Sequence, residues 1–292
     1  MVNGMRIINE VINTNLSRSV YCNNLVNGLW DYWRTLSNLC DNIMREVGEA
    51  YNELRLLENI EFSSDMVYLN LSKERFGKRE GAPTELADII IFVLDYCGDG
   101  YIPPLAGVGE PPDGYPSPID INPKYLEFDS DSFLKKVKQL HSALLTSGKL
   151  SYLRPSFVFQ SLVGNKIRDI VSELKMYDLK MQNNLGSFND LKDDISKKLH
   201  EIIRLVLEFC YAYGIDIDSE VCKKIDYNGS RPFGYRRIGT PVPYDPGTVY
   251  TNLLGYPDNT ITVARGQEMA SEIIKYRLSI RDYLINERRK SK

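Results

Sequence analysis

Histidine is scarce in this 292-residue chain, and cysteine is sparse and scattered. The chain has two histidines, His141 and His200, and five cysteines, none of which forms a CxxC pair. Structural zinc sites need clustered Cys and His ligands, and a serine nucleophile usually needs a histidine base, so both kinds of site are disfavoured. An odd number of widely spaced cysteines indicates reduced thiols, which predicts a cytoplasmic protein.

The sequence also lacks a long hydrophobic run and an excess of positive charge. Its apolar run over residues 89–94 stops at Asp95, which is far too short to cross a membrane. The first residues, MVNGMRIINEVINTN, lack the basic start and long apolar run of a signal peptide. With 36 Lys and Arg against 39 Asp and Glu, the net charge is -3. We therefore expect neither a membrane partner nor a nucleic-acid partner.

What is present is the composition of a globular protein with helical periodicity. Apolar residues make up 43% of the chain and charged residues 26%. Apolar positions recur three and four residues apart, whereas alternation with a period of two is scarce, so we predict an all-α helical bundle. Thr84 is predicted as the N-cap of one helix. The predicted helices cover residues 25–57 (as one helix or two abutting ones), 85–97, 131–147, 156–176, 190–213, 218–226 and 265–289.

Stretches rich in glycine and proline divide the chain into four parts. Such stretches cover residues 98–122 and 229–262, where a regular helix cannot continue, and residues 58–82 are polar and irregular. We predict a first helical unit over residues 1–98 and a loop over 99–130. A second helical unit follows over 131–239, and a C-terminal extension covers 240–292.

The two helical units contain a faint internal repeat. Residues 85–97 resemble residues 198–210, and residues 46–55 resemble residues 166–175. Amphipathic helices often look alike, so a chance similarity and a degenerate tandem repeat both stay open. In a true repeat the second copy has lost acid, because Lys166 replaces Glu46 and Lys198 replaces Glu85. Only the first copy could then hold a metal ion between several carboxylates.

Acidic side chains are paired at helical spacing in the first unit. Glu46 and Glu49 are three residues apart and share a helix face, and Glu85 and Asp88 repeat this spacing on the next helix. Carboxylates without histidine or cysteine favour a hard ion, Mg²⁺ or alternatively Mn²⁺. The plainer alternative is that Glu49 and Glu53, one turn further along, are solvated surface acids and that Glu85 caps its helix. Spacing alone favours that plainer alternative.

The surrounding sequence resembles the MazG-like family of all-α nucleoside triphosphate pyrophosphohydrolases, whose mark is ExxE on one helix and ExxD on the next. Residues 45–50, REVGEA, and 80–97, EGAPTELADIIIFVLDYC, are similar to those two helices. Residues 213–218, YGIDID, and 224–233, KIDYNGSRPF, are similar to the family's tail. Usual members join the tail almost directly to the ExxD helix, whereas here an insertion separates them. The sequence also lacks the histidine and Gly-Gly-Lys with which the family often ends.

The resemblance implies a metal-dependent enzyme. It implies Mg²⁺-dependent hydrolysis of a nucleoside triphosphate, ribo or deoxy, to the monophosphate and pyrophosphate. A narrower activity on dUTP or dCTP is one alternative, and a non-catalytic helical nucleotide-sensing or interaction protein is another. A homo-oligomer, a dimer, is expected. The implied roles are metal ligation by Glu46, Glu49, Glu85 and Asp88, general-base catalysis by Glu49, and substrate binding by Lys224, Asn228 and Arg231.

Overall fold

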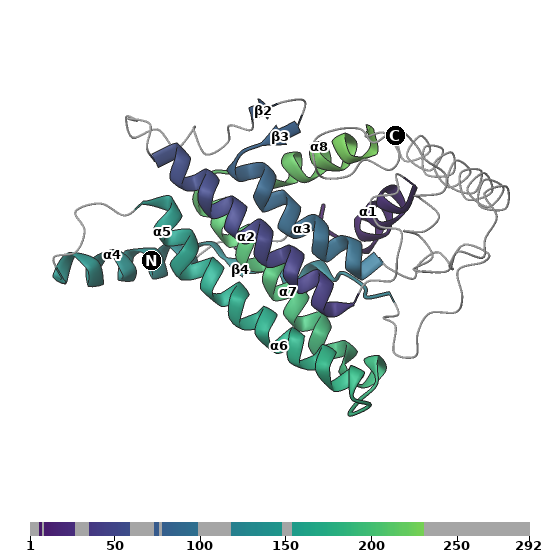
Figure 1. Cartoon of the computed structure of the whole chain (residues 1–292). Helices are drawn as coiled ribbons and strands as arrows, with labels where there is room; N and C mark the ends of the chain where they lie inside the picture. Colours follow the sequence, from purple (N-terminus) through teal and green to yellow (C-terminus); the bar gives the residue numbers. More distant parts are fainter. Residues whose placement is uncertain are drawn as a thin grey trace, which may run out of the picture.

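A computed structural model describes residues 6–7, 9–26, 35–58, 73–75, 78–98, 118–147 and 154–230 (Figure 1). This part of the chain is almost entirely helical, which confirms the predicted all-α fold. The helix and loop predicted beyond residue 230 lie outside the described residues. The helices are α1 (Thr14–Val26), α2 (Leu36–Glu58), α3 (Ala82–Gly98), α4 (Ser130–Thr146), α5 (Pro155–Phe159), α6 (Asn165–Gln182), α7 (Phe188–Ala212) and α8 (Ile217–Ser230).

Within the described ranges, four short strands form two small antiparallel pairs. β1 (Arg6–Ile7) pairs with β4 (Phe128–Asp129), and β2 (Lys73–Arg75) pairs with β3 (Lys78–Glu80). A 3₁₀ turn, η2 (Pro123–Leu126), precedes β4. The β2–β3 pair lies where an irregular stretch was predicted, and that prediction was wrong. Every residue of both strands is charged, so the sequence has no alternation of apolar and polar residues that would predict them.

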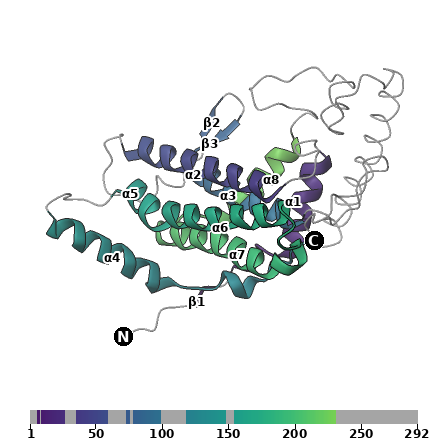
Figure 2. The ribbon, with the colours of Figure 1, turned by 60° about the horizontal axis from the view of Figure 1, so that its bottom comes forward.

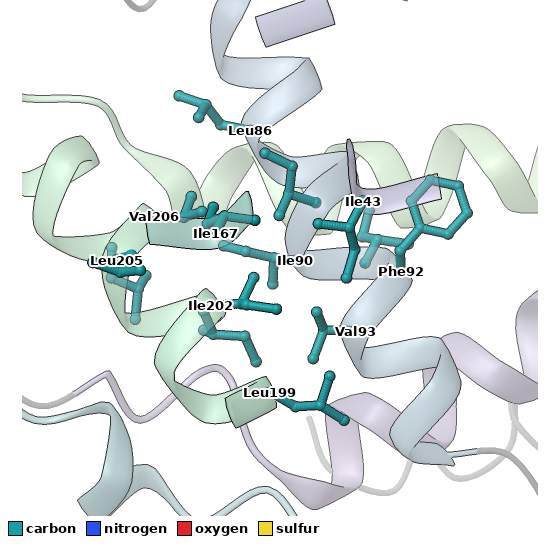
Figure 3. Packing of buried hydrophobic residues seen from close by; sticks show 14 of the residues in the cluster. Ile43, Leu86, Ile90, Phe92, Val93, Ile167, Leu199, Ile202, Leu205 and Val206 are labelled. Atoms are coloured by element: carbon teal, nitrogen blue, oxygen red, sulfur yellow. The ribbon is translucent and has the colours of Figure 1, made fainter. Parts of the chain in front are cut away.

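The centre of the molecule is a bundle of α2, α3, α6 and α7. α2 packs on α3 and α6, and α7 packs on the same two helices. Figure 2 shows α6 and α7 running side by side, with α4 on their outer side. Figure 3 shows side chains from all four helices meeting in the core, among them Ile43, Ile90, Ile167 and Ile202. Removal of these apolar surfaces from water is what holds the bundle together, so the two predicted helical units share one core.

α3 is the most enclosed helix of the bundle. It packs on α2 and α7, and α1 and α8 cover its remaining sides. Every residue of α3 except Asp88 is buried. Gly98 permits this close approach, because a Cβ there would lie 2.6 Å from the backbone oxygen of Ser17 on α1. The hydroxyl of Ser17 also donates to the backbone oxygen of Leu94, at 2.6 Å. No helix in the described ranges is both long and apolar enough to cross a membrane.

The start of α3 corrects the predicted cap. Thr84 was predicted as the N-cap, but the helix begins two residues earlier, at Ala82. The backbone N–H groups of Thr84 and Glu85 instead bond to the backbone oxygen of Gly81, at 2.9 and 3.1 Å. Gly81 has a φ of 123°, which only glycine adopts without strain, and Pro83 is tolerated in the first turn because a proline there forfeits no helical hydrogen bond.

Other helix boundaries are close to those predicted, with two exceptions. α1 begins at Thr14, ahead of the predicted first helix, and α2 begins at Leu36. The helix predicted over 156–176 runs through α5 and α6 and contains a π-helical turn, η3 (Gln160–Gly164). The repeat predicts that α6 and α7 pack beside α2 and α3, and they do.

Aligned positions of the repeat are also buried alike. Counterparts that are buried in both helix pairs are Val47 and Ile167, Ala50 and Ile170, Leu54 and Leu174, Leu86 and Leu199, Ile89 and Ile202, Ile90 and Ile203, Val93 and Val206, and Cys97 and Cys210. Amphipathic helices aligned on their apolar positions bury those positions alike with or without a common origin, so this match fits a degenerate repeat and a chance similarity equally.

Candidate metal centre

Three of the four predicted carboxylates meet where α2 packs against the start of α3. Glu46 comes from α2, and Glu85 and Asp88 come from the first two turns of α3. Each offers an oxygen atom, and the three oxygens lie within 4.8 Å of one another. Glu46 and Glu85 are each only 3% exposed. Ionised groups this deep need compensating charge, so the arrangement is more than a patch of surface acids.

Glu49, the fourth predicted ligand, lies at the rim of this acid cluster. It follows Glu46 by one turn of α2, but its side chain is 41% exposed and it does not join the close group. One oxygen of Glu49 lies 3.9 Å from Nη1 of Arg45. The structure therefore separates three enclosed acids from a fourth that solvent reaches.

Two cationic side chains contact the enclosed acids. Lys224 of α8 donates from Nζ to Oδ2 of Asp88 at 2.7 Å, and the two side chains are 4% and 14% exposed. The guanidinium of Arg45 donates to Oε1 of Glu46 and also lies over the ring of Phe92, 5.8 Å from its centroid. Arg45 was not among the predicted site residues, although its place directly before Glu46 was the available signal.

Of the other two predicted substrate-binding residues, one is near this cluster and one is outside the described residues. Asn228 is one turn after Lys224 on α8 and is 8% exposed. Its Oδ1 has no hydrogen-bond partner in the described part of the chain. Leaving a buried amide oxygen unpaired costs about 1–3 kcal/mol, so this atom is suited to accept a hydrogen bond from a ligand or a water. Arg231 directly follows α8 and is not described.

Thr84 is a second polar residue that sequence reasoning assigned elsewhere. Its hydroxyl is buried beside Glu85, and within the described ranges it has no hydrogen-bond partner. A helical threonine usually donates to the backbone of the preceding turn. As an N-cap, Thr84 would use its hydroxyl to bond the backbone of the helix start. Because α3 begins at Ala82, Thr84 lies inside the helix and its hydroxyl does not have that role.

The donor set fits a hard cation. All three close ligands are carboxylates, which suit Mg²⁺ or Mn²⁺ better than a softer metal. The buried cysteines offer no thiolate, because burial raises the pKa of Cys40 to about 12 and raises those of Cys97 and Cys210 as well. His200 is engaged elsewhere, since its Nε2 accepts from the backbone N–H of Asn122 at 3.0 Å.

The aligned positions of the second helix pair are arranged differently. Lys198, which aligns with Glu85, forms an ion pair with Glu173. Glu201, which aligns with Asp88, lies 3.6 Å from the guanidinium of Arg204. Among the described residues these side chains form no group of three close ligands. Lysine in place of a carboxylate supplies the positive charge that a cation would otherwise bring.

Comparisons with protein-family models, curated proteins and solved structures found no match to this chain. The resemblance to MazG-like proteins therefore depends on the sequence phrases and on whether the residues they contain meet in space.

Proposed function

We propose that this chain is an Mg²⁺-dependent nucleotide pyrophosphohydrolase, which converts a nucleoside triphosphate to the monophosphate and pyrophosphate. One observation carries the proposal. The ExxE, ExxD and tail phrases are far apart in sequence, yet Glu46, Asp88 and Lys224 come together at one place on an all-α bundle. Three unrelated surface motifs would have no reason to converge on a buried cluster.

In this proposal the metal is held by the enclosed acids. Glu46, Glu85 and Asp88 supply oxygen ligands from two helices whose packing fixes their spacing. Bound Mg²⁺ would neutralise phosphate charge and lower the pKa of a coordinated water. Burial of the ligands in the helix interface keeps their carboxylates in place before the ion arrives, which is the preorganisation that a metal site needs.

Proton transfer and nucleotide binding are assigned to Glu49, Asn228 and Arg231. Glu49 is close to the enclosed acids along α2 and open to solvent, so it can accept a proton from an attacking water. Asn228 presents an unpaired amide oxygen on the side of α8 that covers α3, where it can accept a hydrogen bond from the nucleotide. Arg231, directly beyond α8, would bind phosphate through its guanidinium fork.

Product analysis on a panel of nucleotides tests the proposal. Ribo- and deoxynucleoside triphosphates are incubated with the protein and Mg²⁺, and monophosphate and pyrophosphate are separated by chromatography. We expect both products in equal amounts and no turnover in excess chelator. Turnover of dUTP or dCTP alone would favour the narrower enzyme. Nucleotide binding without any hydrolysis would contradict the proposal and favour the nucleotide-sensing alternative.

A pair of variants on α2 separates catalysis from general surface charge. Glu49→Gln removes the proposed base, and we expect turnover to fall about a hundredfold or more. Glu53→Gln removes a partly exposed acid one turn further along the same helix and should leave turnover unchanged. Equal rates in the wild type and in Glu49→Gln would exclude Glu49 as the base while leaving the metal ligands untested by that variant.

A further inference from the structure

The acid cluster is balanced by two cations that differ in their freedom to move. In the described part of the chain, Arg45 contacts Glu46 and Lys224 contacts Asp88. The guanidinium of Arg45 lies within 4 Å of carboxylate oxygens of Glu46 and Glu49. Because its side chain is about one third exposed, it can turn towards solvent. Lys224 has no such route, because its side chain is almost completely buried.

The ammonium of Lys224 is fixed from two directions. It donates to Asp88 at 2.7 Å, and it lies 6.0 Å from the centroid of the Tyr227 ring, within the range of a cation–π contact. Both contacts hold the ammonium group in this position. An ion ligated by Asp88 would thus share this carboxylate with the ammonium of Lys224, and the two positive charges would repel.

The geometry points to Lys224 as an internal counter-ion of the metal site. In this role it stabilises the acid cluster when no divalent ion is bound, and it weakens the cluster's affinity for the free ion. The inference rests on the metal site of the proposed function. It replaces the expectation that Lys224 contacts substrate phosphate with a role as a positioning residue for Asp88, because its ammonium is already engaged and enclosed.

This role has a consequence for the order of binding. The ammonium of Lys224 lowers the affinity of the acid cluster for the free ion. An ion bound to phosphates should bind more tightly than the free ion, because the negative charge of the phosphates offsets the ammonium. We therefore expect the metal affinity of the protein alone to be modest, and to rise when a non-hydrolysable nucleotide is present.

Mn²⁺ binding to the full chain, measured by calorimetry without nucleotide, tests the inference. Lys224→Met removes the charge and keeps the side-chain length, and we expect Mn²⁺ to bind at least about tenfold more tightly than to the wild type. The matched control is Lys223→Met, the neighbouring lysine on α8, which pairs with Glu220 at 2.9 Å and is about half exposed. Lys223→Met should bind Mn²⁺ as the wild type does.

A second readout uses thermal unfolding. In chelator the Lys224→Met variant should melt below the wild type, because the acids lose their counter-charge. Added Mn²⁺ should raise its melting temperature more than it raises that of the wild type. A third variant, Lys224→Arg, retains the positive charge and should keep wild-type Mn²⁺ affinity, so it tests the charge even if Lys224→Met folds poorly.

Two outcomes would overturn the inference. One is a folded Lys224→Met with unchanged or weaker Mn²⁺ affinity, which is what a pure phosphate contact predicts. The other is a Lys224→Arg variant that binds Mn²⁺ about tenfold more tightly than the wild type, as expected only of Lys224→Met. Absence of Mn²⁺ binding to the wild type would be a different failure, since it would remove the metal site of the proposed function itself.

Discussion

The two helix pairs of the bundle have the same apolar faces and different polar chemistry. Leu86, Ile89 and Val93 of α3 are buried like their counterparts on α7, yet Glu85 and Asp88 align with Lys198 and Glu201. Packing constrains the shape of an apolar side chain, because cores are as dense as crystals. It places no such constraint on these polar positions, so one pair can keep a cluster of acids while the other replaces it.

The two pairs also balance their charges differently. Glu46 of α2 pairs with Arg45 of its own helix, whereas Asp88 of α3 pairs with Lys224 of a third element, α8. The acids of the second pair are balanced mostly within α6 and α7, by Lys198 on Glu173 and by Arg204 on Glu201 and Glu208. Each pair also receives a cation from another helix, but Lys224 beside Asp88 is 4% exposed, whereas Lys136 of α4, 3.8 Å from Glu208, is 37% exposed.

The largest difference between the pairs should be in turnover. Asp88→Asn removes a metal ligand and the partner of Lys224, and we expect the rate of nucleotide hydrolysis to fall at least about a hundredfold. Glu201→Gln changes the aligned acid of the second pair and should leave the rate unchanged. Pyrophosphate release at saturating Mg²⁺ measures both. Similar losses in the two variants would show that the pairs are not functionally distinct.

The next difference concerns the ends of α3 and α7. Gly98 of α3 aligns with Tyr211 of α7. α1 covers the end of α3 at Gly98, whereas Tyr211 is half exposed and packs edge-on against Phe128, with ring centroids 5.8 Å apart. Gly98→Ala pushes a Cβ into the backbone of α1 and should lower the free energy of unfolding by about 1–3 kcal/mol. Tyr211→Ala should lower it by no more than about 1 kcal/mol. Urea denaturation measures both, and a larger loss for Tyr211→Ala would refute this packing asymmetry.

A smaller effect should appear in the pH dependence of stability. His200 occupies the position aligned with Ala87, and burial lowers its pKa below the ordinary value of 6.5. The folded protein holds this ring neutral, with Nδ1 donating to the backbone oxygen of Ser196 at 2.7 Å. As the pH falls below 6.5 the unfolded chain takes up a proton first, so stability declines until the pH reaches the folded-state pKa.

His200→Gln isolates that contribution. Glutamine does not titrate, so the variant should show a flatter dependence of unfolding free energy on pH between 6.5 and the folded-state pKa. Denaturation midpoints at several pH values provide the comparison. An unchanged slope in the variant would mean that other groups cause the decline.

Much of the fold could be predicted from the sequence, because burial imposes periodicity. The run from Leu86 to Cys97 is mostly apolar and suits an enclosed helix, whereas the aligned run on α7 is amphipathic and has a helical period. The start of α3 was harder, since Thr84 has the chemistry of an N-cap and only the backbone of Gly81 decides against it. The π-turn was not predicted, because the sequence pattern over residues 156–176 is that of one continuous helix.

The candidate site was predictable in its ligands and not in its charges. Acids spaced three residues apart on two adjacent helices can meet once the helices pack, as Glu46, Glu85 and Asp88 do. The contact of Lys224 with Asp88 spans 136 residues, and no local pattern specifies it. The separation of Glu49 from the enclosed acids depends on how α2 is rotated in the bundle, which the sequence spacing leaves open.

The claim that only one helix pair holds a metal is tested most directly by a crystal of the protein soaked in Mn²⁺ and measured for anomalous scattering. We expect an anomalous peak among Glu46, Glu85 and Asp88, and no peak among the aligned residues Lys166, Asp169, Lys198 and Glu201. Absence of a peak at the first set, or a peak of equal height at the second, would contradict the account.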